Sequence, residues 1–322
     1  MDVNDFDNTH HSNITRRLSI SLYHYLCKHI IGTENHVKTV RIINTVRDNV
    51  SLGNGTATIT SGSFGEGLQM RGSDKDIMHV YTCTEVHANI KSATTIPTKT
   101  HFLMMTEDTK PGFTMLRLID SNNISLISID QNLFLPKLGL VKLELTYYTQ
   151  SYSPTLLSCR KFRGEQHLSN ILFKQILSIE GMSNVHGPCL TDSDGLFDLA
   201  NCLHSKFWVR AALQWSTRSN NAWLYEPTKK KIISHGVLFV PVGDKGSPNE
   251  EFEWRLSFSV GEKFLIYTFS HTQLLCYALM KILLKDVIDI DSRCKKNAVF
   301  LLPEDNYILV IGRTTTLCMD TC

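Results

Sequence analysis

The chain has 322 residues, of which 42% are hydrophobic and 20% charged, so it can bury a substantial core in one large domain or two small ones. Its 33 Lys and Arg against 31 Asp and Glu leave a net charge of +2, which excludes a strong global field for a polyanion. No stretch reaches the roughly 18 uninterrupted apolar residues of a membrane span, the N-terminus is acidic rather than signal-like, and nine scattered Cys form no Cys-x-x-Cys pair. We therefore expect a soluble, cytoplasmic globular protein with free thiols.

The N-terminal region has the apolar spacing of helices. Residues 1–13 are polar and expected to be frayed, a first helix is expected from about Arg16 to Ile31, and a second from Glu34 to the turn signal at 53–55. The second helix carries an apolar stripe made of Val37, Val40, Ile43 and Val46.

The remaining pattern alternates between strand-like and helix-like segments. Strands are expected at 56–60, 76–81, 114–119, 125–129, 138–146, 196–203, 237–242 and 254–259, and loops at 61–67 and at the lysine run 229–231. Helices are expected at 169–179 and 264–288, since the latter segment is rich in Leu and Ile and contains no Gly or Pro. The simplest organisation is an α+β lobe over residues 1–258 and a helical lobe over residues 259–322.

The most informative stretch contains Gly62-Ser63 and, further on, Asp74-Lys75-Asp76. A glycine allows close approach of the backbone to a triphosphate, and the neighbouring amide and hydroxyl can hold phosphate oxygens. Alternate residues of a strand point the same way, so Asp74 and Asp76 are expected to project side by side. Two such carboxylates can hold divalent cations for nucleotidyl transfer.

A third carboxylate is expected from a neighbouring strand. Glu144 and Asp198 both lie on strand-like runs, and the spacing does not choose between them. Asp192 and Asp194 have the sequence context of turn residues, with too few further ligands for a calcium loop.

Several strings resemble a known family. Gly-Ser-Phe-Gly-Glu-Gly at 62–67 and Gly-Ser-Asp-Lys-Asp-Ile-Met at 72–78 are similar to the male-abnormal-twenty-one family, which includes cyclic GMP-AMP synthase. The similarity covers roughly residues 15–290, with its most specific string, Glu-Trp-Arg-Leu-Ser-Phe-Ser, at 253–259, and the wording is nearest to the mollusc members. The resemblance implies a two-lobed nucleotidyltransferase fold, with N-terminal helices on a mixed β-sheet lobe and a C-terminal helical lobe.

The resemblance also implies roles for particular residues. It selects Asp198 as the third acid that binds metal, and assigns Ser63, next to Gly62, to the triphosphate. It places Arg255 beside the base of the acceptor nucleotide and Lys281 in contact with a nucleotide. The implied cofactors are Mg²⁺ or Mn²⁺, and the implied substrates are NTPs such as ATP and GTP.

The chain departs from the family in two places. It lacks the His and Cys cluster of the zinc insertion used to clamp DNA, so no zinc is expected, and His271 and Cys276 are interpreted as helix residues. The end of the chain, 296–322, does not resemble the closing helices of the family, and the adenine-side serine has no match. This end is interpreted as a shortened or alternative form, with strand-like character near 300–303 and 307–311.

Three functions are compatible with these observations. The leading hypothesis is an enzyme that joins NTPs with release of pyrophosphate, which by resemblance produces a cyclic dinucleotide signal in innate immunity after activation by double-stranded RNA or DNA. The second is a catalytically silent binding or scaffold protein with the same fold. The third is nucleotide addition to an RNA 3′ end.

Overall fold

The computed structural model describes residues 3–51, 55–68, 74–89, 96, 98–121, 154–178, 182, 184–213, 215, 225–283, 300–301 and 307–308. The strands predicted at 125–129 and 138–146, together with Glu144, lie outside the described residues. The fold is a mixed α/β arrangement, a curled mixed sheet with several helices, and it is consistent with the α+β class.

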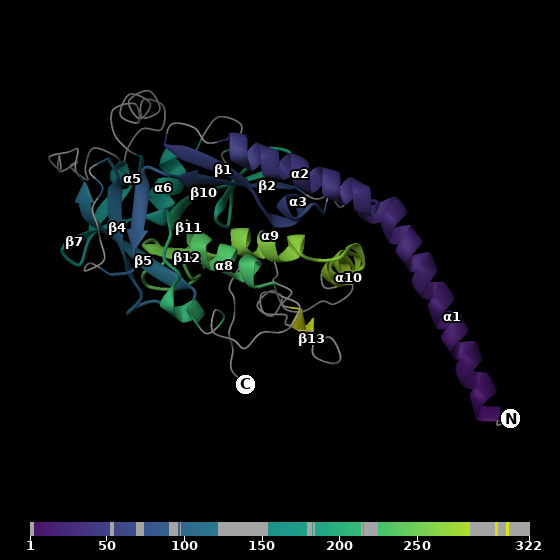
Figure 1. Ribbon diagram of the computed structural model, residues 1–322. Helices are drawn as coiled ribbons and strands as arrows, with labels where there is room; N and C mark the ends of the chain where they lie inside the picture. The colour runs from purple at the N-terminus through teal and green to yellow at the C-terminus, as the bar shows by residue number, and fades with distance from the viewer. Residues whose placement is uncertain are drawn as a thin grey trace.

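The chain begins with two long helices. Helix α1 (Val3–Tyr25) continues into a π-helical turn, η1 (Leu26–Ile30), and α2 (Glu34–Val50) follows. Figure 1 shows α1 extending away from the body, whereas α2 lies along the sheet. The expectation of a frayed start was wrong, because α1 already begins at Val3. The chain turns between the helices at Gly32, whose φ of 101° favours glycine.

The sheet has strand order β1-β2-β10-β11-β12-β5-β4-β3, with further strands attached to it. In that order the bounds are Thr56–Thr60, Lys75–Tyr81, Phe197–Ser205, Val237–Val240, Glu253–Ser257, Phe113–Ser121, Thr100–Met105 and Thr84–His87. Strand β6 (Cys159–Phe162) pairs with β7 (Glu165–Leu168), which pairs with β5; β8 (Asn184–His186) pairs with β9 (Cys189–Thr191), which pairs with β10. Because β3 at one end of the order contacts β10, the sheet curls.

Parallel pairing occurs between β2 and β10 and between β3 and β4, whereas the other pairs are antiparallel.

Two side chains at the end of α2 form hydrogen bonds with backbone groups on the outer edge of β1. The Ser51 hydroxyl donates to the Thr58 carbonyl and accepts from the Thr58 amide, and Asp48 accepts from the Thr60 amide. The helix thereby covers an edge that would otherwise offer unpaired backbone groups to another chain.

The other helices and turns are short. They are α3 (Gly62–Glu66), α5 (Pro154–Leu157), α6 (Asn170–Ile176), the 3₁₀ turn η4 (Arg210–Ala212), α8 (Glu226–His235), α9 (Ser259–Tyr267) and α10 (His271–Ile282). Two short strands, β13 (Phe300–Leu301) and β14 (Tyr307–Ile308), pair with each other, in agreement with the predicted strand-like character there.

Three further predictions about local structure were wrong. Residues 62–66 of the predicted loop form helix α3. The lysine run lies in α8, because Glu226 and the following Pro begin a helix there. Within this helix Lys229 is only 9% exposed, so the run is not a solvated loop. The single helix predicted over 264–288 is divided into α9 and α10, and residues beyond 283 of that range lie outside the described part.

Three apolar clusters hold these elements together. The largest lies within the curled sheet around Trp254, Phe102 and Phe173, all fully buried. A second joins β2, β10 and β11 to Val260 of α9. The third joins the N-terminal helices, through Leu26, Ile31 and Val37, to α9 and α10. The predicted boundary at residue 258 stays a prediction.

Candidate metal and nucleotide site

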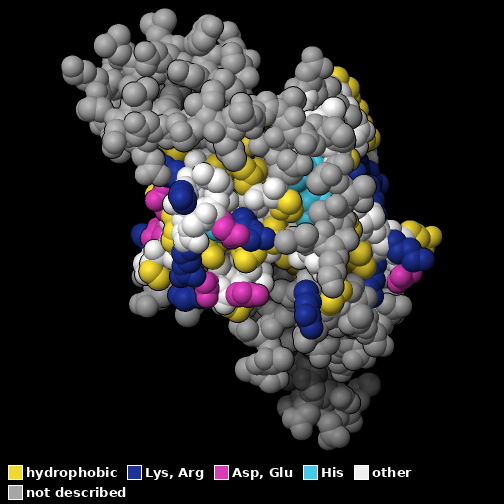
Figure 2. All heavy atoms as spheres, turned by 90° about the vertical axis from the view of Figure 1, so that its left-hand side faces the viewer, with side chains coloured by type: hydrophobic (Ala, Val, Ile, Leu, Met, Phe, Trp, Pro, Cys, Tyr) yellow, Lys and Arg dark blue, Asp and Glu magenta, His cyan; other side chains and the backbone are white. Residues whose placement is uncertain are grey.

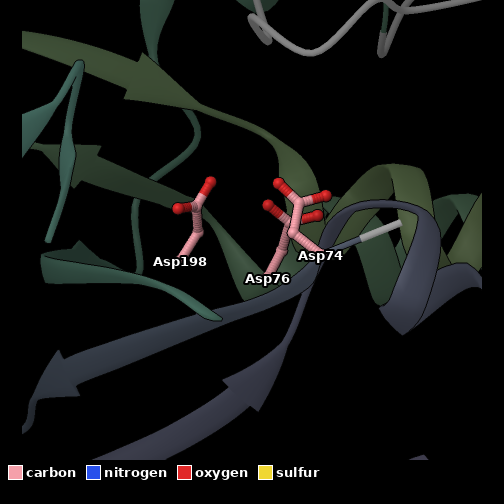
Figure 3. A group of neighbouring side chains, drawn as sticks. All are labelled: Asp74, Asp76 and Asp198. Carbon is pink, nitrogen blue, oxygen red and sulfur yellow. The ribbon is translucent and has the colours of Figure 1, made fainter. Parts of the chain in front are cut away.

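Three aspartates converge at one end of two neighbouring strands. Asp76 lies on β2, Asp74 just precedes that strand, and Asp198 lies on β10, directly opposite Asp76 in the parallel register. Each offers a carboxylate oxygen, and these three oxygens lie within 4.8 Å of one another. Figure 3 shows the three side chains projecting in the same direction, from β2, from the residue just before it and from β10. Among the described residues, this trio is the one group of three or more His, Cys, Asp or Glu placed to hold a metal ion.

Gly62 lets the chain pass close over this group. The residue has a φ of 56°, and a Cβ built on it would lie 2.0 Å from Oδ2 of Asp76. The preceding amide, that of Ser61, donates to the Asp76 carbonyl over 2.9 Å and fixes the start of α3 against β2. A larger residue at position 62 would therefore displace either α3 or the Asp76 carboxylate.

Lys281 connects α10 to this end of the sheet. Its Nζ donates to the Ser63 hydroxyl and to Oε2 of Glu66, each over 3.0 Å. The other oxygen of Glu66 accepts from the Tyr277 hydroxyl over 3.0 Å. Because Glu66 is only 7% exposed, its carboxylate requires hydrogen-bond donors, and Tyr277 and Lys281 supply them. The contact with Glu66 in turn holds the Lys281 ammonium beside Ser63.

Arg255 and Glu262 lie in the wall of the same pocket. Burial lowers the pKa of the Arg255 guanidinium and raises the pKa of Glu262 to about 8, with the nearby Glu66 raising the latter further. Within the described residues, Nε of Arg255 and Oε1 of Glu262 have no hydrogen-bond partner. Among the residues that the structure describes, the wall therefore presents Nε of Arg255 and Oε1 of Glu262 as buried polar atoms without a partner.

Two residues of β9 flank Asp198. The Thr191 hydroxyl donates to Oδ1 of Asp198 over 2.7 Å. Cys189 lines the pocket, and burial together with Asp198 and Asp76 raises the pKa of its thiol to about 12. Cys189 therefore stays a neutral thiol at ordinary pH.

The structure brings the predicted residues into one region. A single pocket is lined by Gly62, Ser63, Asp76, Asp198, Arg255 and Lys281. Asp74 joins it through the acidic trio. The prediction did not include Glu66, Glu262 and Thr191. Glu66 belongs to the string at 62–67, but sequence spacing gave no signal for the other two.

Asp192, His271 and Cys276, which the sequence predicts to be turn or helix residues, are found in such positions. Asp192 is a turn residue, as predicted, and its Oδ1 accepts from the amides of Leu196 and Phe197. His271 and Cys276 both lie on α10, as predicted, and Nε2 of His271 is 3.4 Å from Sγ of Cys27.

The described charges on one face of the molecule are of mixed sign. On the face that Figure 2 shows, Lys and Arg side chains are interspersed with Asp and Glu where residues are described. Some of the charged side chains of the protein form ion pairs, such as Arg117 with Glu165 and Arg163 with Asp108. None of the helices in the described ranges combines the length and the apolar character needed to cross a membrane.

Comparison of the sequence with models of protein families gives no match, and comparison with curated proteins gives none either.

Proposed function

We propose that this chain is a metal-dependent nucleotidyltransferase of the male-abnormal-twenty-one type, with an α+β lobe over residues 1–258 and a helical lobe over residues 259–322. The observation that carries the proposal is the convergence of Asp74, Asp76 and Asp198, with carboxylate oxygens within 4.8 Å of one another. They lie beside a pocket that also holds Ser63 and Lys281. Acids for a cation and donors for a phosphate thus occur together.

The donor set fits a divalent cation. Carboxylate oxygens are the ligands that Mg²⁺ and Mn²⁺ prefer, and Gly62 leaves the space in which the Asp76 carboxylate lies. Asp74, Asp76 and Asp198 would hold the metal. When bound, a divalent cation neutralises charge at a transferred phosphoryl group and makes a nearby hydroxyl more acidic. Fully ionised carboxylates packed this closely repel one another, so a cation relieves that repulsion.

The chain's own residues would bind and orient the substrates. The Ser63 hydroxyl and the Lys281 ammonium supply donors for the triphosphate, and Arg255 lies in the pocket wall for the base. A hydroxyl of one nucleotide forms a bond to the α-phosphorus of an NTP, the bond between that phosphorus and the bridging oxygen breaks, and pyrophosphate leaves. The hydroxyl proton passes to a carboxylate oxygen of Asp198.

The test is an assay of the full chain with labelled ATP and GTP and with Mg²⁺ or Mn²⁺. Parallel reactions contain double-stranded RNA, double-stranded DNA, single strands or no nucleic acid. We expect a phosphatase-resistant dinucleotide and released pyrophosphate, both reduced at least about 100-fold in Asp76→Asn and Asp198→Asn, since each loses a metal ligand. The matched control is Asp194→Asn, which changes an exposed acid in the turn before β10 and should retain activity.

The alternatives give different results in the same assay. Elongated RNA in place of a dinucleotide would indicate addition to an RNA 3′ end. Absence of product under every condition, with nucleotide or duplex binding retained, would indicate a silent binding protein. Activity that survives Asp198→Asn would contradict the proposed role of the acidic trio.

A further inference from the structure

Asp198 is the least exposed member of the acidic trio, and strand β9 supplies a hydrogen bond to its carboxylate. The side chain is 7% exposed, so its carboxylate needs a donor in the protein. The Thr191 hydroxyl is that donor, over 2.7 Å to Oδ1. Within the described residues no Lys or Arg forms an ion pair with Asp198.

The backbone of Thr191 is fixed on both sides. Strand β9 lies between β8 and β10, so Thr191 is directly opposite Asn184 on one side and Asp198 on the other. The turn that follows is closed by Asp192, whose amide donates to the Phe197 carbonyl over 3.2 Å. Because Thr is β-branched, few rotamers are available to its hydroxyl once the backbone is held.

A hydroxyl has a different effect here from a cationic side chain. A Lys or Arg in contact with Asp198 would neutralise the carboxylate and compete with a metal ion for it. A neutral hydroxyl orients the group and occupies Oδ1 while leaving the full negative charge, and it leaves Oδ2 for a ligand. Hydrogen-bond partners of metal ligands act in this way, and their loss commonly weakens metal binding by roughly 10–100-fold.

We propose that Thr191 is a positioning residue that orients the Asp198 carboxylate for a divalent cation. The inference rests on the proposed metal site, but it names a residue outside the metal ligands and the nucleotide contacts inferred above.

The test compares Mn²⁺ binding by wild type, Thr191→Val and Thr191→Ser, measured by calorimetry or by the spin signal of unbound Mn²⁺. Val retains the β-branched shape and removes the hydroxyl, whereas Ser restores the hydroxyl. We expect Kd to rise about 10-fold in Thr191→Val and to return to within about 3-fold of wild type in Thr191→Ser. Ser193→Ala, an exposed change in the adjacent turn, is the control and should match wild type.

Three outcomes separate this inference from the proposed function. Mn²⁺ binding that is equal in wild type and Thr191→Val overturns the role of Thr191 and leaves the metal site intact. Weakened binding in both Thr191→Val and Thr191→Ser indicates a packing effect and also overturns it. Absence of Mn²⁺ binding in wild type overturns the metal site, and the inference with it. A thermal melt of each variant without metal checks that the fold is retained.

Discussion

The absence of a side chain at Gly62 leaves room for the Asp76 carboxylate in the acidic trio. Its φ of 56° and the 2.0 Å separation between a built Cβ and Oδ2 of Asp76 are two separate reasons for glycine. The first is a backbone preference that any residue in the left-handed region shares. The second is specific to this position, because the atom that would be displaced belongs to a proposed metal ligand.

We predict that Gly62→Ala weakens Mn²⁺ binding at least about 10-fold and also lowers stability, since about 1–3 kcal/mol is typical for a strained non-glycine residue. The control is Gly164→Ala, because Gly164 has a φ of 89° but nothing within 4 Å of a built Cβ. The control should share the loss of stability and retain Mn²⁺ binding. Equal Mn²⁺ binding in the two variants would show that Asp76 adapts to the added methyl group.

At the scale of elements, the bounds of strands were easier to predict than the point at which one helix ends and the next begins. Strand β1 was predicted at its observed bounds, 56–60, because its alternation lies between clear turn signals. The stripe on α2 was half right: Val37 and Val40 are buried, but Ile43 and Val46 are 44% and 54% exposed. The buried face of α2 continues through Asn44, which is only 1% exposed, so apolar spacing identified the first part of that face and missed its polar continuation.

The division between α9 and α10 has a local sequence signal, a capping box, which a prediction based on apolar content did not detect. Ser270 caps α10 by accepting from the Gln273 amide, and the Gln273 side chain accepts from the Ser270 amide. This reciprocal pair marks a helix start even where no Gly or Pro interrupts the sequence. The redirected helix then carries Tyr277 and Lys281 toward Glu66.

We predict that Ser270→Ala destabilises the protein by about 1 kcal/mol, because the first turn of α10 loses its cap. The control is Ser234→Ala in α8, where the exposed hydroxyl only donates to the Lys231 carbonyl and caps no helix start. Chemical denaturation of both variants measures the change in the free energy of unfolding. A Ser270→Ala variant as stable as Ser234→Ala would mean that packing alone fixes the start of α10.

At the scale of the whole molecule, the third acid shows what sequence spacing cannot supply. Asp76 and Asp198 are far apart in the chain and meet because β2 and β10 pair in parallel, at a register that places them opposite each other. Spacing along the chain carries no information about this pairing, so Glu144 and Asp198 were equivalent candidates until the resemblance selected one. The structure places Asp198 in the trio, whereas Glu144 lies outside the described residues.

Two partly buried histidines, His204 and His235, are expected to make the stability of the fold depend on pH. Burial, with the neighbouring His204, lowers the pKa of His235 from 6.5 to about 4. The Nε2 of His204 is 2.6 Å from the His235 carbonyl, and burial lowers the pKa of His204 as well. Because the unfolded chain takes up these protons first, the stability due to neutral histidines is complete above about pH 6.5 and is lost as pH falls toward 4.

We predict that the His235 contribution to stability falls by about 1–2 kcal/mol between pH 7 and pH 5, allowing for its partial exposure. Glu262, whose pKa is raised to about 8, changes stability in the opposite direction, since its contribution is lost as pH rises. Urea unfolding of wild type and His235→Gln at each pH separates the two effects, because the Glu262 contribution cancels in the difference, which contains the His235 contribution together with its coupling to His204. A difference that stays constant from pH 7 to pH 5 would contradict the assignment of this pH dependence to His235.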